Sequence, residues 1–167
     1  METIKQTYVQ KQITQALIDL LKKQDFDSIS VSQLTLHAQV GRASFYRHFK
    51  DTRQVLQIYV DHLTNEIHAS ADKFPEDERM LLLLSHYDDH RDFYLALYQA
   101  GLSELLRISI QNTLQLDKQT DNHLAYLIAW YAGATFGWID EWIKRGMMET
   151  PQEMVDHLAN FVKKQDK

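Results

Sequence analysis

The chain has 167 residues, which suits one compact unit or a small domain joined to a larger one. Its two prolines and five glycines are too few for an all-β protein with many tight turns, and 44% hydrophobic with 25% charged residues is a globular composition. The absence of cysteine excludes a disulfide framework, a thiolate zinc site and a cysteine nucleophile.

The net charge of −5 is unevenly distributed along the chain. Residues 1–60 contain eight Lys or Arg and five Asp or Glu, so this part is +3 and the remainder is −8. Salt screens charges beyond about 8–10 Å, so local charge governs attraction to phosphate. The weakly positive N-terminal part permits DNA binding without establishing it.

No segment suggests export or membrane insertion. The first twelve residues are polar and contain no apolar signal region. The longest apolar stretch, residues 124–139, is short for a bilayer span and runs into Asp140 and Glu141. We therefore expect a cytoplasmic protein that does not enter a membrane.

The N-terminal part predicts three helices. A first helix has one apolar face, with hydrophobic residues at helical spacing at Ile13, Ala16, Leu17, Leu20 and Leu21. Ser30 with Gln33 predicts a capping box, flanked by a hydrophobic staple of Ile29 and Leu34, for a second helix that ends near Ala38. A third short helix is expected at about residues 42–49, after a tight connection at residues 39–41.

The remainder also reads as helix. Asp51 with Gln54 predicts a cap for a long helix to about residue 71, and Pro75 marks the next start. Shorter helices are expected at residues 93–98 and 103–114. A long helix at about residues 119–145 ends at Gly146, and Thr150, Pro151 and Glu153 open the last one.

These elements predict an all-α fold of about nine helices. Residues 1–50 are expected to form a three-helix, helix-turn-helix domain. Residues 51–167 are expected to form a C-terminal helical bundle that mediates dimerisation and holds any ligand.

The third predicted helix has the pattern of a helix that reads a DNA groove. Phe45 and Phe49 are four residues apart and face inward. Small residues on the outer face let the backbone approach bases, one long donor reads a base edge, and flanking donors hold phosphates. The outward positions are Ala43, Ser44 and Arg47, and the flanks are Tyr46 and His48. Arg47 is equally compatible with a phosphate contact or a solvated side chain.

The motif resembles that of the TetR family of transcriptional regulators. The matching residues are Ser30, Val31, Leu34, Ala38, Val40, Ser44, Phe45, Tyr46, His48 and Phe49. The resemblance implies a homodimeric regulator, a repressor released by a small-molecule effector, that binds double-stranded DNA at a near-palindromic operator. The DNA-binding residues that it implies are Ser30, Arg42, Ala43, Ser44, Tyr46, Arg47, His48, Lys50 and Thr52.

Three positions depart from the family pattern. Gln39 replaces the usual turn glycine, Gly41 the usual capping serine, and Thr52 the usual lysine. A backbone amide or the Thr52 hydroxyl can still meet a phosphate, and Lys50 or Arg53 can supply the lost charge.

The C-terminal part resembles the short C-terminal domain of a Gram-positive subgroup of the family, which includes regulators of dihydroxyacetone kinase. The matching segments are residues 91–102 and 126–147. Within the long helix, small residues spaced by four form a stripe that lets another helix come close, namely Ala125, Ala129, Gly133 and Gly137. Together with Met154 and Leu158 of the last helix, this stripe is expected to form a four-helix dimer interface. The alternative is that the stripe packs within one subunit.

Aromatic residues are dense in the middle of the chain. The family often holds a ligand pocket between such helices, and the candidate lining residues are Tyr59, Tyr87, Tyr94, Tyr98 and Trp130. The alternative is that these residues are ordinary core.

An enzyme, a cofactor and a metal are not expected. No glutamate has a histidine three residues later, as a di-iron bundle requires, and no phosphate loop or nucleophile elbow is present. His86 and His90 are spaced for a transition metal, but a helix end near Asp89 would break that geometry.

A remaining alternative is a regulator that kept the fold, lost DNA binding and acts through a protein partner, or serves as a co-activator. Thr52 and the mild local charge motivate it. The sequence does not decide between repression and activation.

Overall fold

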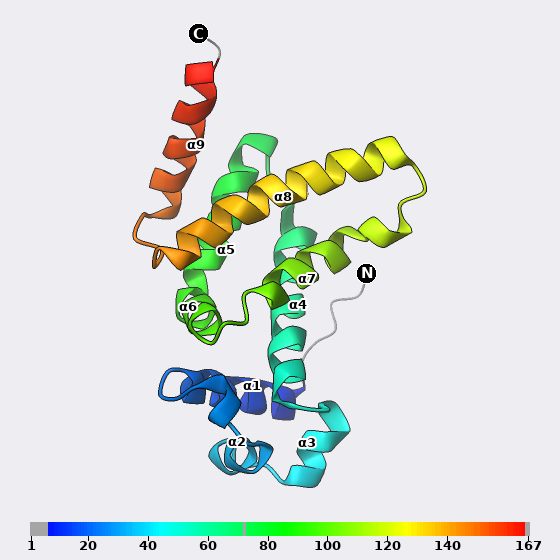
Figure 1. Cartoon of the computed structure of the whole chain (residues 1–167), viewed down its shortest axis with the longest axis vertical. Helices are drawn as coiled ribbons and strands as arrows, with labels where there is room; N and C mark the ends of the chain where they lie inside the picture. The colour runs from blue at the N-terminus through cyan, green and yellow to red at the C-terminus, as the bar shows by residue number, and fades with distance from the viewer. Residues whose placement is uncertain (1–6, 72, 166–167) are drawn as a thin grey trace.

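The computed structural model describes residues 7–71 and 73–165, and within them it contains nine α-helices, three short 3₁₀ turns and no strand (Figure 1). The prediction of an all-α fold is confirmed. The helices are α1 (Tyr8–Leu21), α2 (Val31–His37), α3 (Arg42–His48), α4 (Thr52–Ala71), α5 (Arg79–Asp89), α6 (Arg91–Gln99), α7 (Glu104–Leu114), α8 (Asn122–Lys144) and α9 (Pro151–Gln165). The 3₁₀ turns are Phe26–Ser28, Glu76–Glu78 and Leu116–Lys118.

The first three helices pack around the apolar face of α1. The predicted inward residues of α1 are all buried, and so are Leu34 of α2 and Phe45 of α3. Both helices contact α1 directly. Burial of these side chains, at about 1.5–3 kcal/mol each, holds the short helices in place, because helices of seven residues are not stable alone.

α4 joins this unit to the rest of the molecule. Figure 1 shows α4 running from the α1–α3 unit into the C-terminal helices. Val55, Leu56 and Val60 are fully buried near its start, and Leu63 and Ile67 are buried further along. The two parts of the chain therefore share one continuous hydrophobic core.

Two ion pairs also cross between the parts. Lys22, at the end of α1, pairs with Asp92 of α6 at 2.6 Å, and Arg53 of α4 pairs with Glu104 of α7. All four side chains are at least partly exposed, so we assign them a small share of the stability.

The helix caps agree with the sequence in two of three cases. The amide of Gln54 donates to the Asp51 carboxylate at 2.7 Å, and Thr150 with Glu153 forms the expected reciprocal box. The Ser30 hydroxyl accepts from the Gln33 amide at 3.1 Å, but the Gln33 side chain exchanges two hydrogen bonds with Gln24 instead of returning to Ser30. The predicted capping box at Ser30 is therefore only half formed.

Other boundaries also differ from the prediction. A capping box of Thr7 and Gln10, which the sequence reading missed, opens α1. Pro75 is followed by a 3₁₀ turn before α5 begins at Arg79. α8 begins at Asn122 rather than near residue 119, because the Asp121 carboxylate accepts from the His123 amide and caps the helix there.

The α2–α3 turn places Gln39 in the left-handed backbone region, with φ of 54°. The amide of Val40 donates to the carbonyl of Thr35 at 3.0 Å, which is the hydrogen bond of a Schellman turn. That turn favours glycine, because a Cβ in this conformation costs about 1–2 kcal/mol. Gln39, where the family pattern has glycine, is accordingly a strained position.

We predict that Gln39→Gly stabilises the fold. Relief of the strain, less about 0.5–1 kcal/mol of glycine entropy, leaves a net gain on the order of 0.5–1 kcal/mol and a Tm rise of roughly 1–4 °C. Thermal unfolding followed by circular dichroism measures it. Gln111→Gly in α7 is the matched control and should destabilise by about 1 kcal/mol. A lower Tm for Gln39→Gly would contradict this interpretation of the turn.

Candidate nucleic-acid interface

α3 is anchored by two aromatic side chains. Phe45 and Phe49 are 0% and 2% exposed, and their rings lie 5.6 Å apart. Their inward orientation, expected from the helical period, is confirmed. Gly41 is the N-cap and provides no side-chain hydrogen bond, so the first amides of α3 depend on other partners.

The opposite side of α3 presents donors that the protein does not use. Arg42, Ala43, Tyr46, Arg47 and Lys50 are exposed, and Ser44 and His48 are half-buried. Within the described part of the chain, no hydrogen bond or ion pair engages the polar side chains of this group. Tyr46 and His48 are oriented by ring contacts with Phe45 and Phe49. Figure 1 shows α3 at the end of the molecule opposite α8 and α9.

The hydroxyls of Ser30 and Thr52, at the two ends of the motif, differ in whether they already have a hydrogen-bond partner. Ser30 is exposed, but its hydroxyl already caps α2. Thr52 is half-buried at the first position of α4, and no described residue bonds its hydroxyl. The first amides of α4 lack helical partners, so this end of the helix can still donate to an anion.

Of the two cations suggested to replace the missing lysine at position 52, only Lys50 is free. The Arg53 guanidinium is bound to Glu104. Burial raises the pKa of the Glu104 carboxyl. The hydrogen bond and the charge of Arg53 lower that pKa by more than burial raises it, so the pKa of Glu104 lies below its ordinary value. Arg53 therefore ties α4 to α7 and is not available as a phosphate ligand in this conformation.

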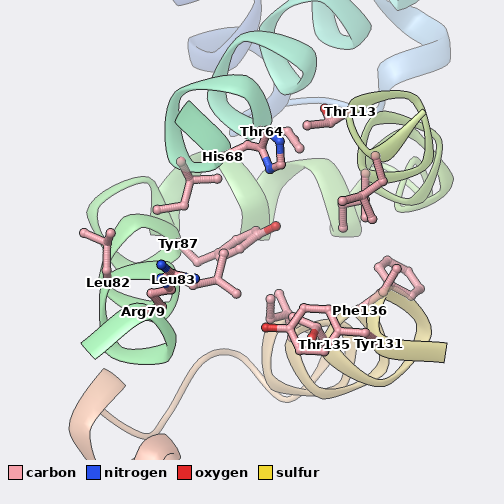
Figure 2. Close-up of a pocket in the computed structure, with 15 residues that line it drawn as sticks. Thr64, His68, Arg79, Leu82, Leu83, Tyr87, Thr113, Tyr131, Thr135 and Phe136 are labelled. Carbon is pink, nitrogen blue, oxygen red and sulfur yellow. The ribbon is translucent and has the colours of Figure 1, made fainter. Parts of the chain in front are cut away.

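A cavity of about 310 Å³ lies in the C-terminal part, between α4, α5, α7 and α8 (Figure 2). Seven of its fifteen lining residues are leucine, isoleucine or phenylalanine. Of the predicted ligand residues, Tyr87 lines it. Figure 2 shows Tyr87 extending from α5 into the space between α4 and α8.

The other four predicted ligand residues do not line this cavity. Tyr94 is core, with its ring 4.7 Å from that of Tyr87, and burial raises its pKa. Tyr59 packs edge-on against Phe93, and the Tyr98 hydroxyl donates to Asp140 at 2.9 Å. Trp130 is 73% exposed on the outside of α8.

Six polar lining residues come from four helices that are far apart in the sequence, and they were missed in the sequence analysis. They are Thr64, His68, Arg79, Thr113, Tyr131 and Thr135. No local pattern connects them, so no sequence signal could have grouped them.

The outer face of α8 is apolar and uncovered. Tyr126 and Trp130 are more than 70% exposed, and Ala129, Gly133 and Gly137 are exposed beside them. A Cβ added at Gly133 or Gly137 would meet nothing within 4 Å. The alternative that the small stripe packs inside the subunit is therefore not supported, although Ala125 is half-buried.

One residue of the expected dimer interface needs correction. Met154 is 6% exposed and belongs to the subunit's own core, because α9 packs against α5. Its side chain is not available to a partner. Leu158, one turn later, is half-buried.

The histidine pair lies at the end of α5. α5 ends at Asp89 and His90 is its cap, with the two rings 5.0 Å apart. Burial and the neighbouring His90 lower the pKa of His86. Among the described residues, no group of three or more His, Asp or Glu is arranged to hold a metal ion.

None of the described helices combines the length and the apolar character that a bilayer span requires.

A helix-turn-helix with a free outer face, joined through α4 to a helical bundle, defines a DNA-binding transcriptional regulator. Residues 13–57 match the family of bacterial regulatory proteins named tetR, and residues 76–164 match a transcriptional regulator C-terminal region. The chain belongs to the TetR family. The similar proteins whose names state a function are regulators of transcription and not enzymes.

Over 95 residues the chain is 28% identical to the dhaKLM operon transcriptional activator DhaS of Lactococcus lactis, which covers 56% of this chain and 51% of that protein. The match thus spans about half the length of this relative. A solved structure of the dihydroxyacetone kinase operon activator DhaS is similar, with a TM-score of 0.62 and 21% identity over 95% of this chain and 96% of that one. The structure of Lin0861 from Listeria innocua has a TM-score of 0.74 at 15% identity, over 96% and 94% of the chains. At these identities the structures establish the fold.

We predict that Lys50→Ala makes DNA affinity less dependent on salt, whereas Arg53→Ala does not. Each lost phosphate contact lowers the slope of log K against log salt by about 0.9, and a dimer loses two. Titrations at several salt concentrations measure the slope. An equal loss of slope in Arg53→Ala would show that the pair with Glu104 opens on DNA.

Proposed function

We propose that the chain is a sequence-specific DNA-binding regulator that acts as a homodimer on a near-palindromic operator. The observation that carries the proposal is the outer face of α3, where exposed donors have no partner among the described residues while the inner face is held by Phe45 and Phe49. A protein that must reach the chromosome in this way acts in the cytoplasm.

The proposed contacts follow from the position of each residue on α3. Ala43, Ser44 and Arg47 lie against the base edges, because they occupy the outward side of the helix. Tyr46 and His48 lie against phosphates on either side. Arg42 and Lys50 add charge at the two ends of α3, and Ser30 and Thr52 stand at the first turns of the adjoining helices. Residues 1–50 are thus the DNA-binding domain, and residues 51–167 the regulatory domain.

The outer face of α8 supports dimerisation. Exposed tyrosine and tryptophan side chains rarely gather on a monomer without a partner. Gly133 and Gly137 let a second helix approach closely, and Trp130 is then an interface residue rather than a ligand residue. Two copies of α8, with α9 beside each, would form the four-helix interface.

The route from the cavity to DNA is α4. The same helix lines the cavity through Thr64, Ile67 and His68, and only three residues separate its start from the end of α3. A ligand that shifts α4 would change the spacing of the two α3 helices and so release the operator, as expected for a repressor.

A second candidate is activation. The relative from Lactococcus lactis is named an activator, and Thr52 here replaces a charged phosphate ligand. A chain that has weakened its own DNA contacts would act through a protein partner or as a co-activator.

The test is a titration against DNA upstream of the chain's own gene and against sequences selected from random pools. We expect a near-palindromic site bound at least a thousandfold more tightly than random duplex, with about 4 kcal/mol of discrimination. Repeated selection that yields no preferred sequence would refute specific binding and favour the partner-dependent alternative.

Variants of α3 distinguish residues that contact phosphates from residues that contact base edges. Tyr46→Phe and His48→Ala should weaken binding to all sequences by similar factors. Arg47→Ala should change the preferred base at one position by about 1–3 kcal/mol. The reverse result would mean that α3 is rotated in the groove.

The dimer is tested by Gly133→Leu. The new side chain meets open space in the subunit and improves helix propensity, so the fold should persist. A partner helix would be displaced, at a cost of roughly 1–3 kcal/mol from each side of a symmetric contact. Sedimentation should show dissociation, and operator affinity should fall.

Ala69→Leu, at an exposed position of α4, is the control and should remain dimeric. A Gly133→Leu protein that stays fully dimeric and binds DNA as before would remove this face from the interface.

A further inference from the structure

The cavity between α4, α5, α7 and α8 is lined by one arginine and by no carboxylate. Arg79 and His68 line it, and none of the other lining residues is acidic. The chain as a whole has a net charge of −5, so a cavity free of carboxylates is not explained by composition. This lining favours a ligand that carries negative charge.

Arg79 is free to bind such a charge. Its Nε donates to the carbonyl of Phe74 at 3.3 Å, and no described carboxylate pairs with the guanidinium. Arg53, Arg91 and Arg145 each pair with a carboxylate. The two terminal nitrogens of Arg79 remain available for bidentate recognition of a carboxylate.

Two hydroxyls inside the cavity also lack partners. Thr64 is 6% exposed, and its Oγ1 is buried without a hydrogen bond. Tyr87 is 2% exposed, and none of the described residues bonds its hydroxyl, which Figure 2 shows within the cavity. Burial raises the pKa of Tyr87, so this hydroxyl stays protonated and can donate. Buried polar groups are normally paired, so unpaired ones that line a cavity indicate a polar group on a ligand.

The rest of the wall sets the size and character of the ligand. Leu82, Leu83, Ile110, Leu114 and Phe136 give it an apolar body. A volume of about 310 Å³, filled at the density of a protein interior, holds on the order of a dozen non-hydrogen atoms.

We propose that this cavity binds a small amphipathic carboxylate, with the carboxylate at Arg79 and a hydrocarbon or aromatic body against the apolar wall. The proposal rests on the ligand-responsive function proposed above and names the chemical class of its effector. Thr64 and Tyr87 provide hydrogen bonds for an oxygen on the ligand body or at its head.

Three probes of equal length and different charge test it, namely octanoate, octanamide and octylamine. Isothermal titration of the full-length protein, at fixed salt and without DNA, measures each affinity. We expect octanoate to bind at least tenfold more tightly than octanamide, and octylamine to bind more weakly than both. Equal affinity for octanoate and octanamide, tightest binding of octylamine, or no octanoate binding at millimolar concentration would overturn the proposal.

Variants assign the preference to residues. Arg79→Gln should lower octanoate affinity to that of octanamide and leave octanamide unchanged. Arg107→Gln removes an exposed arginine of α7 outside this cavity and is the matched control, expected to keep the tenfold preference. Thr64→Val, of similar shape, should weaken octanoate binding without changing the fold. A tenfold preference that survives Arg79→Gln would contradict the assignment of the carboxylate.

The outcome is independent of the DNA test. Octanoate preference without operator binding would support this inference and refute the DNA-binding function. Operator binding without octanoate preference would support the DNA-binding function and refute this inference. When both hold, octanoate should reduce operator affinity of the unmodified protein and not that of Arg79→Gln.

Discussion

The structure depends on the burial of α4 at both of its ends. Near the start, Val55 and Leu56 are fully buried in the core that α1 and α3 share. Further along, Leu63 is buried in the same core, and Ile67 is buried beside the cavity. Neither end can shift without exposing apolar surface. The helix that follows the DNA-binding motif is thus also a wall of the cavity. The ion pairs beside it, such as Arg53 with Glu104, are partly exposed and adjust the contact rather than create it.

The two sides of α8 differ in what covers them. Its inner side is buried at Ala132 and Ile139, which also line the cavity, while its outer side is uncovered at Trp130 and Gly133. Tyr131 lines the cavity and is 59% exposed, so it stands where the two sides meet. A partner that covered the outer side would therefore also restrict the cavity, which would make dimer stability and ligand affinity interdependent.

The arginines of the molecule differ in whether the fold uses their side chains. Arg91 bonds the backbone carbonyls of Gly146 and Met147 and so holds the turn after α8 against α6. In the part of the chain that the structure describes, Arg42 and Arg47 on α3 have no such partner, and Arg79 bonds one carbonyl. A donor that the fold does not use is free for phosphate or carboxylate, and both proposed sites contain such donors.

The sequence by itself determined the local features. Helical periodicity set the inward face of α1 and the orientation of Phe45 and Phe49, and short-range caps located the starts of α4 and α9, because these depend on residues within one turn of each other. The outward face of α3, and with it the candidate DNA contacts, followed from the same period.

Only the tertiary structure decided which side chains are committed to distant partners. Arg53 meets Glu104, 51 residues away, Gln33 bonds Gln24 instead of its own cap, and Met154 faces the subunit's core. Trp130 lies outside and Arg79 lines the cavity, although both belong to apolar helices. An amphipathic pattern gives the apolar side of a helix but not the surface that covers it, because that surface is formed by segments far away in the chain.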